Sequence, residues 1–265
     1  FQICYLKKNT VMINLLSMTS VQWEKTSFSK LAAEVSKLPV FLQLLTLCPI
    51  SDLELEEFLR KVRQKILFEL NDAKITDNLV KLQKAIAKQN YLTEYIQLVE
   101  EIEVDEVNLL RSQVADKLAS GKSLESSSIL CLASYESLLN YSFKDDIYSR
   151  KNLSSVFLQQ VIEPLRDSAI KDTIKPLGEV DNEISIRVKE QYENYPYPRW
   201  RSVGIVKEQI TLRKFSRNPQ FNFIHDDIET VSNPRILVAG CGTGQQVVET
   251  ACLFENSKVV AIDLS

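Results

Sequence analysis

The sequence predicts an all-α N-terminal domain followed by the start of an α/β domain, and three observations lead to this fold class. Residues 50–163 contain no proline and a single glycine, Gly121, and so few chain-breaking residues are typical of helices. Residues 236–239 form a short apolar run, as expected for a strand covered on both faces. Residues 258–262 form a second apolar, β-branched strand, and three of the chain's six glycines lie between the two, within residues 240–244.

The chain divides into four predicted parts. They are a poorly patterned segment (1–30), an all-helical domain (31–178), a linker helix with an aromatic and proline-rich arm (179–234), and the first βαβ unit of a Rossmann-like domain (235–265). The first segment is expected to be a frayed start or the tail of a missing part. Because a parallel sheet of two strands would expose long apolar edges, we expect a fragment, truncated at least at the C-terminus.

Six helices are expected in the helical domain, where apolar residues recur at helical spacing. Ser51 to Glu54 has the pattern of a capping box that opens the first of them. Gly121 is placed to end a helix that starts at Asp105, and Pro164 to end or kink the last one. The others are expected from about residue 77, around 91–99, over 123–139 and over 153–162. Such a domain is expected to be structural or partner-binding rather than catalytic.

A linking helix is expected over residues 181–192, followed by Gln-Tyr-Glu-Asn-Tyr-Pro-Tyr-Pro-Arg-Trp at 191–200. We call residues 191–201 the aromatic arm. Its two prolines favour an extended backbone. Two interpretations stay open: a rigid arm whose rings pack on the sheet domain, or a lid over a pocket, with Arg199 and tyrosine hydroxyls making polar contacts. His225, the only histidine, is predicted to be a surface residue of a loop.

Composition excludes several classes of protein. The net charge of -3 gives no basic field for nucleic acid. Five scattered cysteines without a C-x-x-C pair argue against a disulfide framework or zinc site, and favour a reducing, cytoplasmic setting. No apolar run reaches the ~20 residues of a membrane span. We therefore expect no metal and no membrane span, and the charge balance disfavours a nucleic-acid partner without excluding it.

The glycine cluster predicts a nucleotide site. Glycines let the backbone turn sharply and approach a ligand closely, and the helix that follows offers free N–H groups and a positive dipole end. Asp263 lies 19 residues after Gly244, near the spacing of the ribose-binding acid in nucleotide-binding βαβ units. The unit is thus expected to bind a cofactor that contains adenosine. Cys241 fits this turn as a small residue, and no base is apparent that would make it a nucleophile.

The glycine spacing distinguishes between cofactors. The dinucleotide fingerprint is G-x-G-x-x-G, whereas this chain has G-x-G-x-G and Gln245 at the position of the third fingerprint glycine. A longer side chain there crowds the path of a pyrophosphate. The turn is instead similar to that of class I S-adenosyl-L-methionine (SAM) methyltransferases, although Ala239 replaces the acidic residue that many of them have before the first glycine.

Two motifs together resemble one family of bacterial class I SAM-dependent methyltransferases with a helical region before the Rossmann-like domain. They are the segment 191–200, similar to the family's Q-Y-E-x-x-P-Y-P-R-W, and the segment 238–246 together with Ala-Ile-Asp-Leu-Ser at 261–265. Weaker similarities at 48–52 and 90–95 extend the resemblance over roughly residues 40–265. Some members carry tetratricopeptide repeats upstream, and no repeat is seen here.

The resemblance implies SAM as cofactor and an unknown methyl acceptor, a protein or a small molecule. It implies that Gly240, Gly242 and Gly244, with Cys241 in the same turn, approach the methionine part of SAM, and that Asp263 binds the ribose. Tyr192 and Tyr197 are implied to border the methyl donor. No catalytic residue can be named, and the fragment by itself is expected to be inactive. Two alternatives stay open: an NAD(P)-binding oxidoreductase, and a non-catalytic helical interaction protein with a degenerate nucleotide fold and a protein partner at its helical domain.

Overall fold

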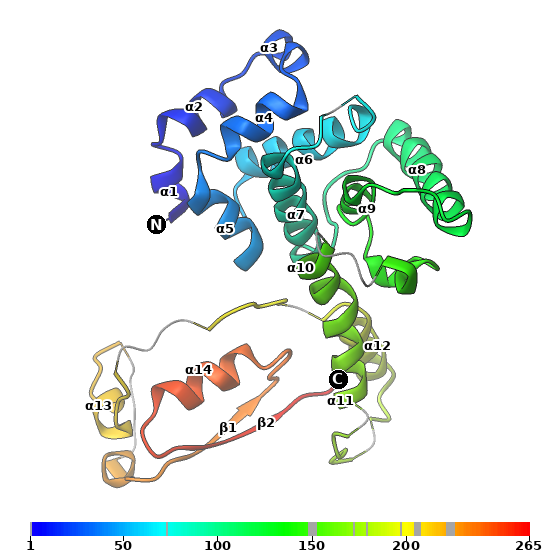
Figure 1. The fold of residues 1–265 in the computed structure, drawn as a ribbon. Helices are drawn as coiled ribbons and strands as arrows, with labels where there is room; N and C mark the ends of the chain where they lie inside the picture. The colour runs from blue at the N-terminus through cyan, green and yellow to red at the C-terminus, as the bar shows by residue number, and fades with distance from the viewer. Residues whose placement is uncertain are drawn as a thin grey trace. The chain divides into compact units, whose positions relative to one another are not determined.

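The chain forms two compact units, Phe1–Lys175 and Pro176–Ser265, in a computed structural model (Figure 1). The structure describes residues 2–72, 74–147, 153–171, 173–178, 180–196, 198–203, 208–220 and 226–265. No helix within these ranges is both long and apolar enough to cross a membrane.

The described residues of the first unit form helices joined by turns and loops, without a strand. Its α-helices are α1 (Gln2–Leu6), α2 (Thr10–Leu16), α3 (Ser20–Lys25), α4 (Phe28–Val35), α5 (Pro39–Leu47), α6 (Leu53–Phe68), α7 (Asp77–Leu92), α8 (Glu101–Ala119), α9 (Ser126–Leu132), α10 (Ser154–Phe157) and α11 (Glu163–Lys171). Helix α7 contacts α4, α5, α6, α9 and α10 and lies at the centre of this unit (Figure 1). Its apolar positions Leu79, Leu82 and Ile86 are almost fully buried, so this helix organises the core.

The N-terminal segment is part of this core, so the expectation of a frayed start is wrong. Asn9, Thr19 and Ser27 cap α2, α3 and α4 by accepting a hydrogen bond from a backbone N–H of the following turn. Met12 and Phe28 are fully buried. Helices α2 and α3, of seven and six residues, are too short for apolar spacing to repeat, which is why the pattern did not reveal them. Helix α4 does show helical spacing, at Phe28, Leu31, Ala32 and Val35, and was missed because the apolar pattern was followed only from residue 51 on.

Two predicted helix boundaries move because of local capping. The side chain of Asp52, not Ser51, accepts from the N–H of Leu55 at 3.2 Å and begins α6. Helix α8 begins at Glu101, four residues before the expected Asp105, because a reciprocal capping box joins Glu100 and Glu103. Gly121 ends α8 with a φ of +65°, as predicted.

Two other predicted helices are wrong in extent. The stretch 91–99 is not a separate helix, since α7 continues to Leu92 and the chain then turns at Glu94 and Tyr95, both with a φ of +54°. The helix expected over 123–139 is limited to α9, followed by turns and a short 3₁₀ segment, Leu138–Asn140. In both stretches apolar residues keep helical spacing beyond the point where the helix ends, so the spacing by itself did not reveal the turns.

Pro164 does not end its helix, which continues as α11, but a π-helical turn precedes it. Leu158–Ile162 is a π-helical turn between α10 and α11, a feature that commonly produces kinks. Because proline has no N–H, the carbonyl of Gln160, four residues earlier, loses its ordinary helical partner. The hydroxyl of Ser137 donates to this carbonyl at 3.1 Å, so a side chain from another segment replaces the missing bond.

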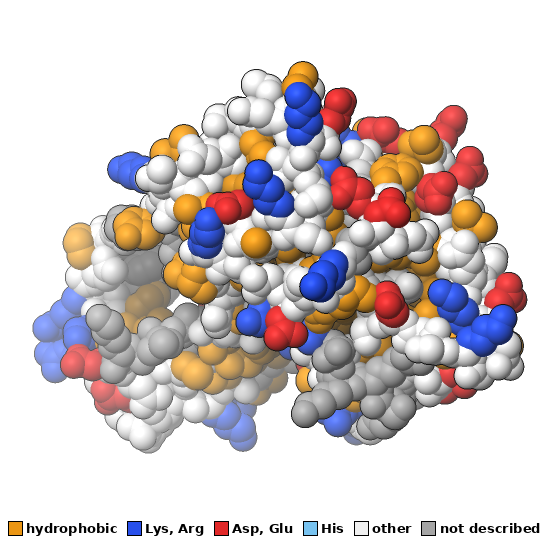
Figure 2. All heavy atoms as spheres, turned by 45° about the horizontal axis from the view of Figure 1, so that its top comes forward, with side chains coloured by type: hydrophobic (Ala, Val, Ile, Leu, Met, Phe, Trp, Pro, Cys, Tyr) orange, Lys and Arg blue, Asp and Glu red, His pale blue; other side chains and the backbone are white. Residues whose placement is uncertain are grey.

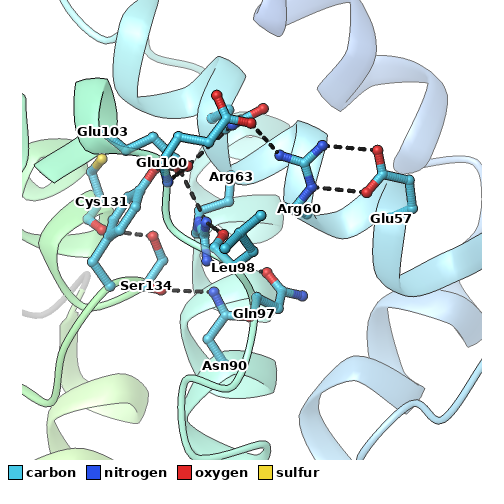
Figure 3. A network of polar contacts seen from close by, with 12 residues as sticks. Glu57, Arg60, Arg63, Asn90, Gln97, Leu98, Glu100, Glu103, Cys131 and Ser134 are labelled. Atoms are coloured by element: carbon cyan, nitrogen blue, oxygen red, sulfur yellow. Dashed lines mark hydrogen bonds and ion pairs between the residues drawn. The ribbon is translucent and has the colours of Figure 1, made fainter. Parts of the chain in front are cut away.

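A buried ion pair joins α6 to α8 (Figure 3). Arg63 Nη2 lies 3.0 Å from Glu103 Oε1, and the two side chains are 2% and 0% exposed. Glu103 also accepts from the hydroxyl of Tyr135 at 2.7 Å, from Gln64 Nε2 at 3.1 Å and from the N–H of Glu100 at 2.9 Å. Burial would raise the pKa of Glu103, but these hydrogen bonds and the charge of Arg63 outweigh it and leave the pKa below its ordinary value.

Charged side chains of both signs occur over the face of the molecule seen in Figure 2. No continuous stretch of Lys and Arg covers the described part of that face. This view agrees with the small net charge of the chain.

The second unit contains a small α/β element. Its members are α12 (Glu183–Asn194), α13 (Leu212–Ser216), a 3₁₀ segment (Asp226–Thr230), β1 (Arg235–Ala239), α14 (Gln245–Leu253) and β2 (Lys258–Ile262). The strands pair in parallel, with Arg235 opposite Lys258 and Ala239 opposite Ile262. The fold is therefore an all-α region with a small parallel α/β element, as predicted at this coarse level.

The two faces of this sheet differ in exposure. Val238 is 8% exposed, whereas Leu237 and Val260, which pair across the strands on the opposite face, are 61% and 45% exposed. The expectation that β1 is covered on both faces is thus wrong in this structure. Helix α14, which connects the strands and contacts β2, can cover only one face.

Candidate functional site

The site is built on the turn between β1 and α14. The N–H groups of Gly240 and Cys241 both donate to the carbonyl of Ile262, at 2.9 and 3.2 Å, so the turn is held at the carboxyl end of β2. Gly240 and Gly244 have φ values of +71° and +84°, a region that side chains with a Cβ rarely adopt. A Cβ built on either would meet nothing within 4 Å, so the backbone of the turn borders open space.

Asp263 lies directly beside this turn. Its Oδ2 accepts from the N–H of Gly242 at 2.7 Å, and its Oδ1 accepts from the N–H and hydroxyl of Ser265, each at 3.1 Å. Burial would raise the pKa of Asp263, but the N–H groups of Gly242 and Ser265 lower it below its ordinary value. The residue is exposed to solvent, so an ionised carboxylate with spare acceptor capacity is presented at the tip of β2.

The aromatic arm is joined to the glycine turn through one residue, Thr243. The Thr243 hydroxyl donates to the carbonyl of Pro198 at 2.7 Å, and Trp200 Nε1 donates to the carbonyl of Thr243 at 3.0 Å. Of the two interpretations of the arm, packing against the sheet domain is therefore observed for its described residues. The contact also places the arm at the edge of the turn where a ligand would lie.

A cavity of about 920 Å³ lies between the arm and the glycine turn. This is within the ~300–1,000 Å³ range of small-molecule sites. Its lining comprises Val188, Tyr192 and Pro198 from the linking helix and the arm, and the following residues from the βαβ unit: Gly240, Cys241, Gly242, Thr243, Gln245, Gln246, Glu249, Ile262, Asp263 and Leu264. The structure thus brings Tyr192 together with the turn and Asp263. Gly244, which precedes α14, is not among the lining residues, and Tyr197 and His225 lie outside the described residues.

The titratable lining groups indicate binding rather than nucleophilic chemistry. Burial raises the pKa of the Cys241 thiol, and the nearby charge of Asp263 raises it further. The thiol therefore stays protonated at neutral pH, which agrees with its interpretation as a small residue of the turn. No group of His, Cys, Asp or Glu side chains suited to a metal ion occurs in the described chain.

Three contributors to the site were not singled out from the sequence. Thr243 and the backbone of Pro198 join the arm to the turn, and Glu249 lines the cavity beside Gln245. The position of Glu249, four residues after Gln245 on a predicted helix, was a usable signal because such residues share a helix face. The Thr243–Pro198 pair spans 45 residues, and no local pattern indicates it.

Comparisons of the chain with protein-family models, with curated proteins and with solved structures find no match.

Proposed function

We propose that residues 176–265 form the cofactor-binding part of a class I SAM-dependent methyltransferase with a Rossmann-like domain. The observation that carries this proposal is the joint placement of Asp263, the positive-φ glycine turn and a 920 Å³ cavity at the carboxyl ends of two parallel strands. Ligands of open α/β sheets bind at this edge.

The described residues fit SAM. The carboxylate of Asp263 suits the two hydroxyls of a ribose, and the open backbone of Gly240 and its neighbours suits the amino-acid part. Tyr192 and Pro198 supply the facing wall. When bound, SAM supplies an electrophilic methyl group on a sulfonium. The protein's task is then mainly to orient donor and acceptor, because proximity accounts for much of the rate of such a transfer.

The remaining predictions follow from this proposal. The acceptor is a protein or a small molecule, and no catalytic base is assigned. We place the protein in a reducing, cytoplasmic setting because all five of its cysteines are unpaired.

The NAD(P) alternative is disfavoured by Gln245. This side chain lines the cavity and its Nε2 donates to Glu249 Oε1 at 3.2 Å. It occupies the position where a dinucleotide fold needs a glycine for close approach to the pyrophosphate.

Calorimetric titration with S-adenosylhomocysteine (SAH), and with NADH as control, tests the proposal. We expect micromolar affinity for SAH and none for NADH. Asp263→Ala removes the acceptor for the ribose and should weaken SAH about tenfold or more, as expected for hydrogen bonds to a charged group. Asp181→Ala, an exposed acid of the same unit, should leave the affinity unchanged. Absence of SAH binding would refute the proposal, and binding of NADH alone would support the oxidoreductase alternative.

A further inference from the structure

The charges that line the cavity all have the same sign. Among its described lining residues, Asp263 and Glu249 are acidic, and none is Lys, Arg or His. Asp263 is engaged by the N–H groups of Gly242 and Ser265. The cavity therefore carries a net negative charge. The charge of Glu249 is offset by fewer hydrogen-bond donors than that of Asp263.

Glu249 is positioned by its own helix. It lies one turn after Gln245 on α14, and Gln245 Nε2 donates to its Oε1 at 3.2 Å. Its Oε2 accepts no hydrogen bond and meets no cation from the described residues. The side chain is half-buried, so water screens its charge less than that of a fully exposed carboxylate.

A carboxylate held in this way distinguishes ligands by charge. It attracts a cationic group in the cavity and repels a pyrophosphate. SAM and SAH share the ammonium and carboxylate of their amino-acid part and differ at sulfur, which carries a positive charge in the donor and none in the product, so an attraction to the sulfur acts on the donor alone.

Resting on the proposed SAM site, we propose that Glu249 is a specificity-determining residue that makes this cavity prefer the sulfonium donor to its uncharged product. Loss of the methyl group then removes the attraction between Glu249 and the sulfur and favours release of SAH. Gln245 is the positioning residue that holds the Glu249 carboxylate on the cavity side of α14.

Calorimetry on the whole chain tests this with three probes: SAM, SAH and sinefungin, an analogue in which a carbon bearing a protonated amine replaces the methylated sulfur. Glu249→Gln keeps the size of the side chain and removes its charge. We expect this variant to bind SAM and sinefungin about fivefold more weakly, the size expected of a partly exposed ion pair, and SAH with unchanged affinity. The matched control is Glu255→Gln, which removes the same charge from the same unit outside the cavity lining.

A second readout is the dependence on salt. In the unmodified protein the affinity for SAM should fall more steeply with ionic strength than the affinity for SAH, and Glu249→Gln should remove this difference. Equal weakening of all three ligands, or no change in any, would overturn the role of Glu249 while leaving the cofactor site in place. Failure of the unmodified chain to bind SAH would instead overturn the proposed function, and this inference with it.

Discussion

Replacing Glu103 with glutamine should destabilise the helical unit severely. Glu103 is fully buried and accepts hydrogen bonds from Arg63, Tyr135, Gln64 and the N–H of Glu100. Glutamine keeps one acceptor oxygen, but its NH₂ group would face donors, and the 2% exposed side chain of Arg63 would keep its charge without a counter-ion.

The expected loss follows from this burial. Removing one partner of a buried ion pair typically costs about 3–5 kcal/mol, a large part of the ~5–15 kcal/mol that stabilises a typical domain. Glu34→Gln is the control, because Glu34 pairs with Lys37 at 2.7 Å on the surface of the same unit, with side chains 38% and 56% exposed. That change should cost no more than about 0.5 kcal/mol.

Urea unfolding followed by circular dichroism measures both changes. The double variant Arg63→Met, Glu103→Leu should lose less stability than the sum of its single changes, because the two buried charges are removed together. A Glu103→Gln variant within about 0.5 kcal/mol of the Glu34→Gln control would refute the reasoning, as would strict additivity of the double variant.

The same pair predicts a pH dependence. Because the pKa of Glu103 is lowered in the folded state from an ordinary value of 4.5, its contribution is fully present above that value. It is lost as pH falls through the lower folded-state pKa, since the unfolded chain binds the proton more readily. Unfolding measured between pH 6 and about pH 3 should therefore show a decline that Glu103→Gln makes shallower. Identical slopes would contradict this assignment.

Two further changes test the contacts found in each unit. Thr243→Val removes the hydroxyl that donates to Pro198 and should speed hydrogen exchange in residues 198–203 and weaken SAH, at a cost of about 1 kcal/mol. Thr250→Val, on the helix α14 that follows the turn, is its control, and unchanged exchange would exclude a role for the contact. Ser137→Ala leaves the buried carbonyl of Gln160 without its donor and should cost about 1–2 kcal/mol in urea unfolding, whereas an effect near zero would show that this bond does not compensate for Pro164.

The βαβ unit was predicted to within a residue or so. Strand β2 spans residues 258–262 as expected, and β1 begins one residue earlier than expected, at Arg235. Helix α14 (Gln245–Leu253) directly follows the glycine turn, where a helix was expected. Apolar runs and clustered glycines are local signals, and the glycine turn connects consecutive elements, so no distant contact was needed to interpret them.

The helical unit was predicted less well because its boundaries depend on contacts beyond the helix. The apolar spacing predicted a helix that runs across Glu94 and Tyr95, where the chain in fact turns with positive φ values. The Tyr95 hydroxyl donates to the carbonyl of Ala133 at 3.4 Å, 38 residues away. The short helices before residue 28 were missed for a different reason, since α2 buries only Met12 and Leu15 and α3 has no buried residue.

The sequence by itself determined the strand–turn–helix–strand order of the βαβ unit, its glycine turn and the acid at the tip of β2, because backbone conformation and strand pairing there depend on neighbouring residues. Only the tertiary structure decided which groups meet across long separations: Thr243 with the aromatic arm, Arg63 with Glu103, and Ser137 with the carbonyl left by Pro164. The physical reason is that a buried polar group must find a partner, and the fold rather than the local sequence selects which partner is within reach.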